Sequence, residues 1–161
     1  MSGSRRAAAA ARRRLAGPRA LLRAALLALR LEVVLRRRSL PRLAAWAGVA
    51  LDTGARPGAL PLGLPSAGAD RRAVAAVQRV YGRWPVEGTC LRQSLVAGRM
   101  LRHLEPRLHV GVGRDAGTVR AHAWLEVQGH TWDPLAVTYA RVERAAPPAP
   151  PRSPSGPAAG A

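Results

Sequence analysis

The chain has 161 residues, enough for one domain with a modest core and some appendages. Its formal net charge is +17, yet every basic residue is arginine and phenylalanine is absent, a usage typical of GC-rich coding sequence, so the charge alone is weak evidence for a nucleic-acid-binding protein. A single cysteine excludes an intrachain disulfide framework, fits a reducing, cytoplasmic compartment and leaves one free thiol.

The N-terminal part of the chain holds most of the basic excess. Residues 1–44 contain twelve arginines against one acid, Glu32. Residues 1–14 predict a flexible Ala/Arg-rich leader. Three charged residues interrupt the apolar run at 20–35, so this run is too polar for a membrane span and too irregular for a secretory signal. Contact with a membrane surface stays open.

A helical region and a linker follow the leader. Residues 15–50 predict one or two amphipathic helices, broken near Ser39–Pro41. The apolar face of the first helix is formed by side chains at helical spacing: Leu22, Leu26, Leu29 and Val33. Residues 51–69 are rich in Gly and Pro and predict a linker.

Residues 70–144 carry the strongest pattern, two helices followed by strands. Asp70 is a candidate cap for the first helix, and Thr89 for a second helix that starts at Cys90. Three strands are predicted next, at His109–Gly113, Thr118–Val127 and His130–Val137. The remaining residues, 145–161, are rich in Pro and Ala and predict a disordered tail.

Cys90 is a candidate nucleophile because of its place at a helix start. A thiol reacts as thiolate, and a helix N-terminus or a nearby histidine lowers its pKa. The backbone amides of the first turn could also donate hydrogen bonds to an oxyanion. The alternative is a buried cysteine that packs as a small apolar side chain.

His122 is the candidate base, and Asp133 the candidate carboxylate that orients it. Side chains alternate between faces along a strand, so His122 shares a face with Trp124. If Gln128–Gly129 is a two-residue hairpin turn, Trp124 pairs with Asp133, which then lies diagonally beside His122. Glu126 shares this face but is too far along the strand. The alternatives are a strand histidine bonded to a carbonyl and a strand-end aspartate.

The other histidines and the tryptophans have simpler interpretations. No metal-ligand spacing joins the remaining histidines, which we interpret as surface or packing residues: His103, His109 and His130. No metal or other cofactor is predicted. Trp84 and Trp132 flank the candidate residues in the sequence, where core packing is the default and a wall of a peptide groove is the alternative.

Three stretches together resemble a known enzyme family. They are T-C-L-R-Q-S-L from Thr89, H-V-G-V-G-R-D from His109 and A-H-A-W-L-E-V-Q-G from Ala121. The combination, within about residues 84–135, resembles the transglutaminase-like leader peptidases of lasso-peptide biosynthesis. The histidine followed by Ala-Trp is shared by the wider transglutaminase and papain-like group.

The resemblance implies a fold, a reaction and partners. The fold would be α+β, a transglutaminase/papain-like protease core in which a nucleophile helix lies against a small antiparallel sheet, preceded by amphipathic helices. The catalytic residues would be Cys90, His122 and Asp133. The substrate would be a ribosomally made precursor peptide, cut at its leader–core junction. A small leader-binding protein would present it, and an ATP-dependent lasso cyclase would act afterwards, with no nucleic acid among the partners.

Two other function classes remain open from the sequence. A transglutaminase-like amide hydrolase or acyltransferase acting on another substrate would use the same three residues. A nucleic-acid-binding protein would use the arginine-rich N-terminus instead, with binding that weakens steeply with salt and does not depend on Cys90.

Overall fold

The structure is a computed structural model that describes residues 17–52, 60–63, 68–85, 89–115 and 118–136. Its helical elements are α2 (Pro18–Leu35), α3 (Leu40–Ala47), α4 (Gly68–Tyr81), α5 (Thr89–Met100) and the short 3-10 helix η1 (Arg102–Leu104). Its strands are β1 (Ala50–Asp52), β2 (Arg107–Asp115) and β3 (Thr118–Glu126). The predicted leader at 1–14 and tail at 145–161 lie outside the described residues.

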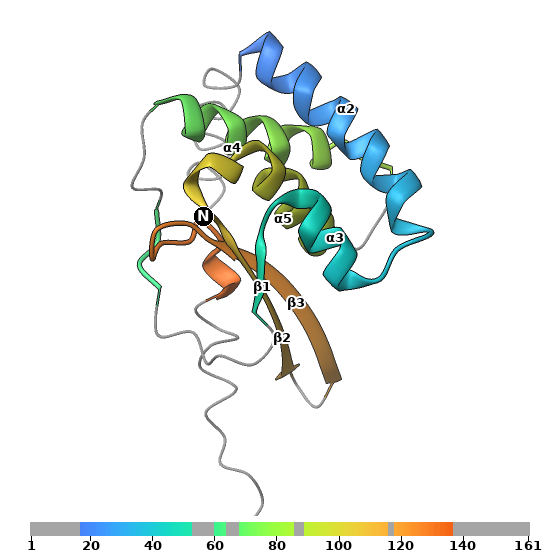
Figure 1. The fold of residues 1–161 in the computed structure, drawn as a ribbon. Helices are drawn as coiled ribbons and strands as arrows, with labels where there is room; N and C mark the ends of the chain where they lie inside the picture. The colour runs from blue at the N-terminus through green and yellow to red at the C-terminus, as the bar shows by residue number, and fades with distance from the viewer. Residues whose placement is uncertain (1–16, 53–59, 64–67, 86–88, 116–117, 137–161) are drawn as a thin grey trace, which may run out of the picture.

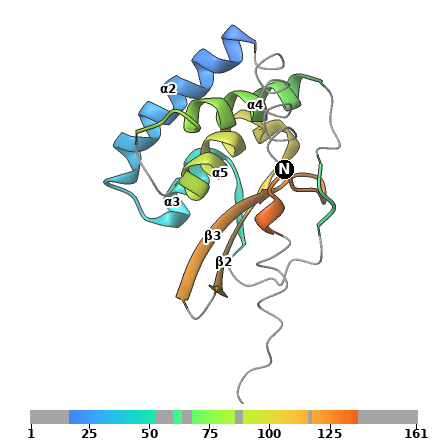
Figure 2. The same cartoon turned by 180° about the vertical axis from the view of Figure 1, so that it is seen from behind.

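The helices form one layer and the strands another. Figure 1 shows α2, α3, α4 and α5 gathered on one side of the sheet, and the view from behind in Figure 2 shows the same two layers. One cluster of buried side chains connects α2, α3, α4 and α5 with β2 and β3. The predicted α+β class, with amphipathic helices preceding a nucleophile helix and a small sheet, is confirmed.

The sheet differs from the predicted antiparallel one. Its order is β1-β2-β3, and β2 and β3 form an antiparallel pair whose register joins Asp115 to Thr118 at the turn. β1 pairs with β2 in parallel, Ala50 opposite Arg107, so the sheet is mixed. Part of β1 falls in the predicted linker at 51–69, where the Gly- and Pro-rich composition hid a three-residue strand.

The predicted hairpin turn at Gln128–Gly129 is present. Both residues have positive φ, 50° and 75°, and Val127 and His130 exchange two backbone hydrogen bonds of 2.8 and 3.0 Å. These are the features of a tight two-residue hairpin turn. Pairing with β3 then stops, so the expected third strand at His130–Val137 is wrong.

After the hairpin turn, the backbone of the chain forms hydrogen bonds with the segment at 60–63 in place of β3. The Thr131 amide donates to the Pro61 carbonyl at 3.1 Å, and the Thr131 carbonyl accepts from Gly63 at 2.7 Å. Pro134 has no amide to give to a ladder, and residues 134–136 are helical. Asp133 therefore sits at the entry to a helical turn and not within a strand.

The α2 helix turns the predicted apolar face outward. The four side chains of this face are exposed, while the buried ones are Ala24, Ala28 and Leu31. Small alanine side chains let a helix axis approach its neighbours closely, and α2 packs on both α4 and α5. The periodicity identified the helix correctly, and the structure places its smaller side chains towards the core.

Polar side chains of α5 connect it to the helices around it. Arg92 forms an ion pair with Glu32 of α2 at 2.7 Å. Arg99 donates to the Trp46 carbonyl of α3 at 2.9 Å, and its guanidinium lies 5.8 Å from the centre of the Trp46 ring. These contacts hold the helix that carries Cys90 in a fixed position against α2 and α3.

Gly98 of α5 lies close to the side chain of Val49, which precedes β1. A Cβ atom at position 98 would overlap Cγ1 of Val49. Alanine normally stabilises a helix interior relative to glycine. Here Gly98→Ala is instead expected to lower the free energy of unfolding by roughly 1–3 kcal/mol, because Val49 is branched and buried.

Urea denaturation of the purified variants would measure this effect. Val49→Ala removes the overlapping methyl group, so the double variant is expected to cost less than the sum of the two single substitutions. If the free-energy costs of the two single substitutions simply added in the double variant, the alanine at position 98 and the side chain of Val49 would not be in contact.

Candidate active site

Cys90 is the second residue of α5 and is half-buried beside the edge strand β3. Ala123 of β3 turns its backbone towards α5, where its carbonyl accepts a hydrogen bond from Ser94 Oγ at 3.2 Å. Its backbone, like that of Leu91, also hydrogen-bonds the Cys90 sulfur. Through these contacts the start of α5 lies against the backbone of β3 and presents the thiol to this strand.

His122 contacts both other candidate residues. Its Nε2 lies 2.8 Å from Oδ2 of Asp133, and its ring is hydrogen-bonded to the thiol of Cys90. Since Nε2 faces the carboxylate, Nδ1 is the nitrogen left for the sulfur. The structure therefore brings together all three residues that the sequence singled out.

Asp133 reaches His122 by a different route from the predicted strand pairing. Its Oδ1 accepts from the Leu135 amide at 2.9 Å, and its own amide donates to Thr131 Oγ1 at 3.2 Å. One carboxylate oxygen thus accepts a hydrogen bond from the helical turn at 134–136, and the other faces the imidazole of His122. The predicted contact exists, although the predicted third strand does not.

The pKa values of the thiol and the imidazole move in opposite directions. The hydrogen bond with His122 lowers the pKa of Cys90 most, against the effect of burial, and hydrogen bonds with the backbone of Ala123 and Leu91 act in the same direction. Burial alone would lower the pKa of His122, but the hydrogen bonds and charges of Asp133 and Cys90 outweigh it and raise this pKa to about 9. Both shifts favour the thiolate–imidazolium pair over the neutral pair.

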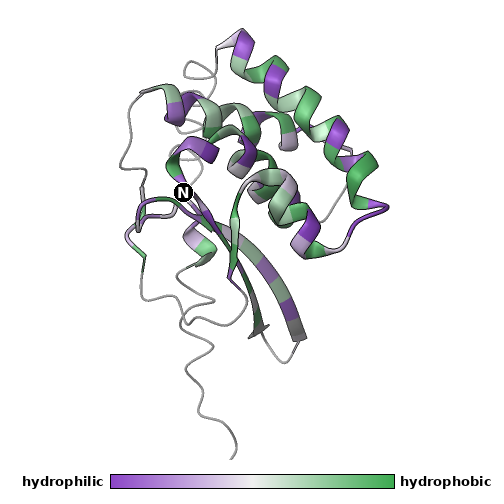
Figure 3. Ribbon diagram, in the orientation of Figure 1, coloured by the Kyte–Doolittle hydropathy of each residue, from purple (hydrophilic) through white to green (hydrophobic). Residues whose placement is uncertain are grey.

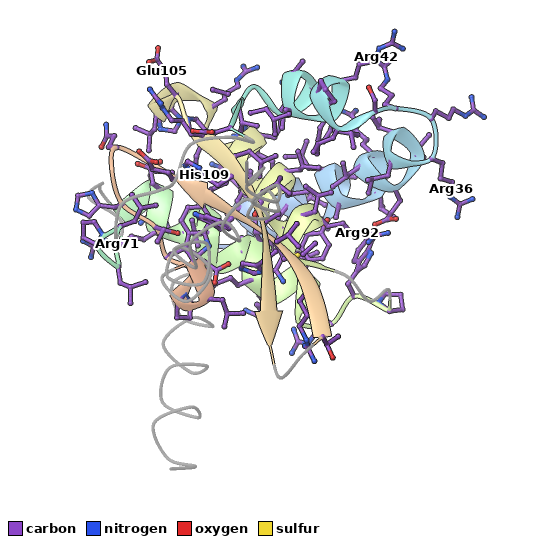
Figure 4. The ribbon with its side chains drawn as sticks, turned by 90° about the horizontal axis from the view of Figure 1, so that it is seen from below. Arg36, Arg42, Arg71, Arg92, Glu105 and His109 are labelled. Carbon is purple, nitrogen blue, oxygen red and sulfur yellow. The ribbon has the colours of Figure 1, made fainter. Side chains whose placement is uncertain are left out.

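A second histidine–carboxylate pair lies nearby on the same sheet. His109 of β2 is buried, its Nε2 is 2.9 Å from Oε2 of Glu126, and it also faces Asp52 at 3.9 Å. His109 and His122 both stack with Trp124, with ring centroids 5.5 and 5.9 Å apart (His109 is labelled in Figure 4). Glu126 thus serves a different histidine from the one that faces the thiol.

His109 was predicted to be a surface or packing residue, and its pairing with the carboxylates of Glu126 and Asp52 was not predicted. The hairpin between β2 and β3 places it opposite Trp124, a register that a two-residue turn between the strands would have predicted. Among the described residues, no group of three or more His, Cys, Asp or Glu side chains has the arrangement of a metal site.

An open groove of about 560 Å³ exposes the three candidate residues to a substrate. Its walls come from α4, from α5 and from the segment after β3, and include Gln78, Tyr81, Gly82, Gln93, Trp132, Pro134 and Leu135. Trp132 thus lines the groove while also packing on the core, whereas Trp84 packs against Tyr81, with ring centroids 5.8 Å apart. The wall residues of α4 carry no sequence signal that separates them from ordinary helix positions.

A helix-borne thiol, a strand-borne imidazole and a carboxylate lie together in one groove of an α+β fold, the set of groups that a cysteine nucleophile uses. The model of the transglutaminase-like superfamily matches residues 25–144. The chain belongs to this superfamily, whose fold typically carries cysteine peptidase or acyltransferase activity. Neither the curated proteins nor the solved structures gave a match. Among the described residues, no helix is both long and apolar enough to cross a membrane.

Proposed function

We propose that this chain is a cysteine peptidase that removes the leader peptide from a ribosomally made lasso-peptide precursor. The observation that carries the peptidase assignment is the chain of contacts from Cys90 through His122 to Asp133 in an open groove. The substrate assignment rests on the resemblance of the stretches around Cys90 and His122 to the leader peptidases.

The reaction follows from the charges of the site. The Cys90 thiolate attacks the carbonyl carbon at the leader–core junction, forming a C–S bond, and the Cys90 amide at the start of α5 donates to the oxyanion. The imidazolium of His122 gives its proton to the leaving amine as the C–N bond breaks. His122 then takes a proton from water, which hydrolyses the thioester and releases the leader as a carboxylate.

Asp133 acts on His122 and not on the substrate. Its carboxylate fixes the imidazole with Nδ1 towards the sulfur and stabilises the imidazolium that the leaving amine needs. The released core peptide has a free N-terminal amine, which the ATP-dependent lasso cyclase would use to close the macrolactam. The small leader-binding protein would deliver the precursor to the groove.

Mass spectrometry of a cleavage reaction tests this function. The full chain, a lasso-peptide precursor and the leader-binding protein are expected to give one cut at the leader–core junction. Cys90→Ala is expected to abolish the cut. His109→Ala, which removes the neighbouring histidine outside the groove, is expected to leave the position of the cut unchanged.

Two results would contradict the proposal. A cut that survives Cys90→Ala would exclude the thiol mechanism. Transfer of the acyl group to an added amine, in place of hydrolysis, would favour the acyltransferase alternative on the same residues.

A further inference from the structure

The outward face of α2 carries a stripe of aliphatic side chains that the fold leaves uncovered. Leu22, Leu26, Leu29 and Val33 are 63%, 51%, 57% and 64% exposed, whereas the buried residues of the helix lie on its other side. Figure 3 shows α2 at the outside of the helical layer, with hydrophobic and hydrophilic bands alternating along it. We call these four residues the α2 stripe.

The spacing of the α2 stripe is that of a helix–helix seam. Its members follow one another by four, three and four residues, and at 3.6 residues per turn they fall within an arc of roughly 60°. A face that packs on a broad apolar surface spans about 100° or more, while a narrow stripe with a 3.5-residue repeat fits one partner helix. The geometry thus favours a single helix over a membrane surface.

Positive charge lies along one side of this stripe. Arg19, Arg23 and Arg30 all project from that side, all are exposed, and no ion pair is formed by any of them within the described part of the chain. Arg19 and Arg23 also line a hollow of about 560 Å³ together with Arg102 and the paired side chains of His103 and Asp70, 3.2 Å apart. On the opposite side Glu32 is already bound to Arg92.

We propose that the α2 stripe docks one amphipathic helix of a partner protein, with a row of Asp or Glu residues beside its apolar seam to face Arg19, Arg23 and Arg30. A second copy of this chain fits poorly, because it offers the same arginines and its Glu32 is engaged. The proposal does not depend on the peptidase reaction, since the stripe lies outside the groove around Cys90.

Binding of a designed peptide to the full chain tests the charge and the seam separately. The probe is a fluorescent three-heptad peptide with leucine at the seam positions and glutamate on both flanks, which keep it from pairing with itself at neutral pH. Fluorescence anisotropy is expected to show binding that weakens with salt. The same peptide with lysine in place of glutamate is expected to bind at least tenfold more weakly.

Two variants and one control locate the site. Leu26→Ser with Leu29→Ser is expected to weaken binding roughly a hundredfold, because two seam contacts are lost. Arg23→Gln with Arg30→Gln is expected to weaken it roughly tenfold and to flatten the salt dependence. Arg36→Gln with Arg42→Gln removes the same charge from side chains that project away from the fold (Figure 4) and is expected to leave binding unchanged.

The alternatives give different results. Equal affinity for the glutamate and lysine peptides, or binding that survives the double serine variant, would overturn the proposal. So would failure of the folded chain, checked by circular dichroism, to bind the glutamate peptide. Two further results, each combined with no binding of the peptide, would assign the stripe to another occupant. Self-association in sedimentation that is lost in the serine variant would assign it to a second copy. Adhesion to phosphatidylglycerol vesicles that is lost in the serine variant would assign it to a membrane.

Discussion

Alkylation of Cys90 by iodoacetamide at pH 6.5 is expected to slow by roughly tenfold or more in His122→Ala. An ordinary thiol has a pKa near 8.5 and is about 1% thiolate at this pH. The hydrogen bond with His122 is the largest cause of the lowered pKa of Cys90, and burial, which remains in the variant, acts in the opposite direction. Part of the gain in thiolate is offset because a thiolate of lower pKa is a weaker nucleophile.

The measurement is unusually direct because the chain has one cysteine. Intact mass spectrometry counts a single adduct, and its rate across pH gives the pKa of this thiol without any substrate. The wild-type midpoint is expected well below that of a free thiol, and the midpoint of His122→Ala well above the wild-type one.

His109→Ala is the matched control for this experiment. His109 is also buried, also bonded to a carboxylate and also stacked on Trp124, but it is bonded to Glu126 and faces no thiol. Loss of His109 is expected to lower stability while leaving the alkylation midpoint in place. Equal midpoints in wild type and His122→Ala would show that the helix start, and not the imidazole, activates the sulfur.

The sequence was sufficient to predict that the three candidate residues lie together, because their positions depend on local patterns. The helix carrying Cys90 and the strand carrying His122 follow from caps, alternation and turn residues that lie within a few positions of each other. The tight turn at Gln128–Gly129 then limits how far Asp133 can be from His122, whatever the chain does next. Short-range constraints of this kind hold even when the pairing partner is misjudged.

Long-range contacts explain what the sequence did not predict. The Thr131 backbone pairs with the segment at 60–63, and β1 pairs with β2 across more than fifty residues. Neither segment carries an alternating pattern long enough to predict a strand. Likewise, the buried side of α2 is chosen by its fit against α4 and α5, where Ala24 and Ala28 allow an approach that larger side chains would prevent.

Removal of the Asp133 side chain is expected to have a large effect on cleavage of the precursor. Asp133→Ala leaves the imidazole without its partner at Nε2, so both its orientation and the charge that stabilises the imidazolium are lost. The expected fall in kcat/KM is roughly 10²- to 10⁴-fold, as for the carboxylate of other three-residue nucleophile sites. Initial rates of junction cleavage, measured by mass spectrometry, would give the value.

Asp133→Asn separates the orientation from the charge. The single amide oxygen of asparagine can still accept from Nε2–H and keep the imidazole oriented, but the amide nitrogen that replaces the second carboxylate oxygen cannot accept from the Leu135 amide. The pKa of His122, about 9 in the wild type, is raised partly by the Asp133 charge. Loss of that charge lowers this pKa, so the alkaline limb of the pH–rate profile is expected to move to lower pH, with a smaller fall in rate at neutral pH than in Asp133→Ala.

Glu126→Gln is the control that makes this comparison specific. It removes the same charge from the other histidine–carboxylate pair, in which the histidine is His109. The alkaline limb is expected to stay in place in this variant, because Glu126 does not contact the imidazole that shares a proton with Cys90. If Glu126→Gln moved the limb as far as Asp133→Asn does, the effect would be one of general charge, and Asp133 would lose its assignment as the residue that positions His122.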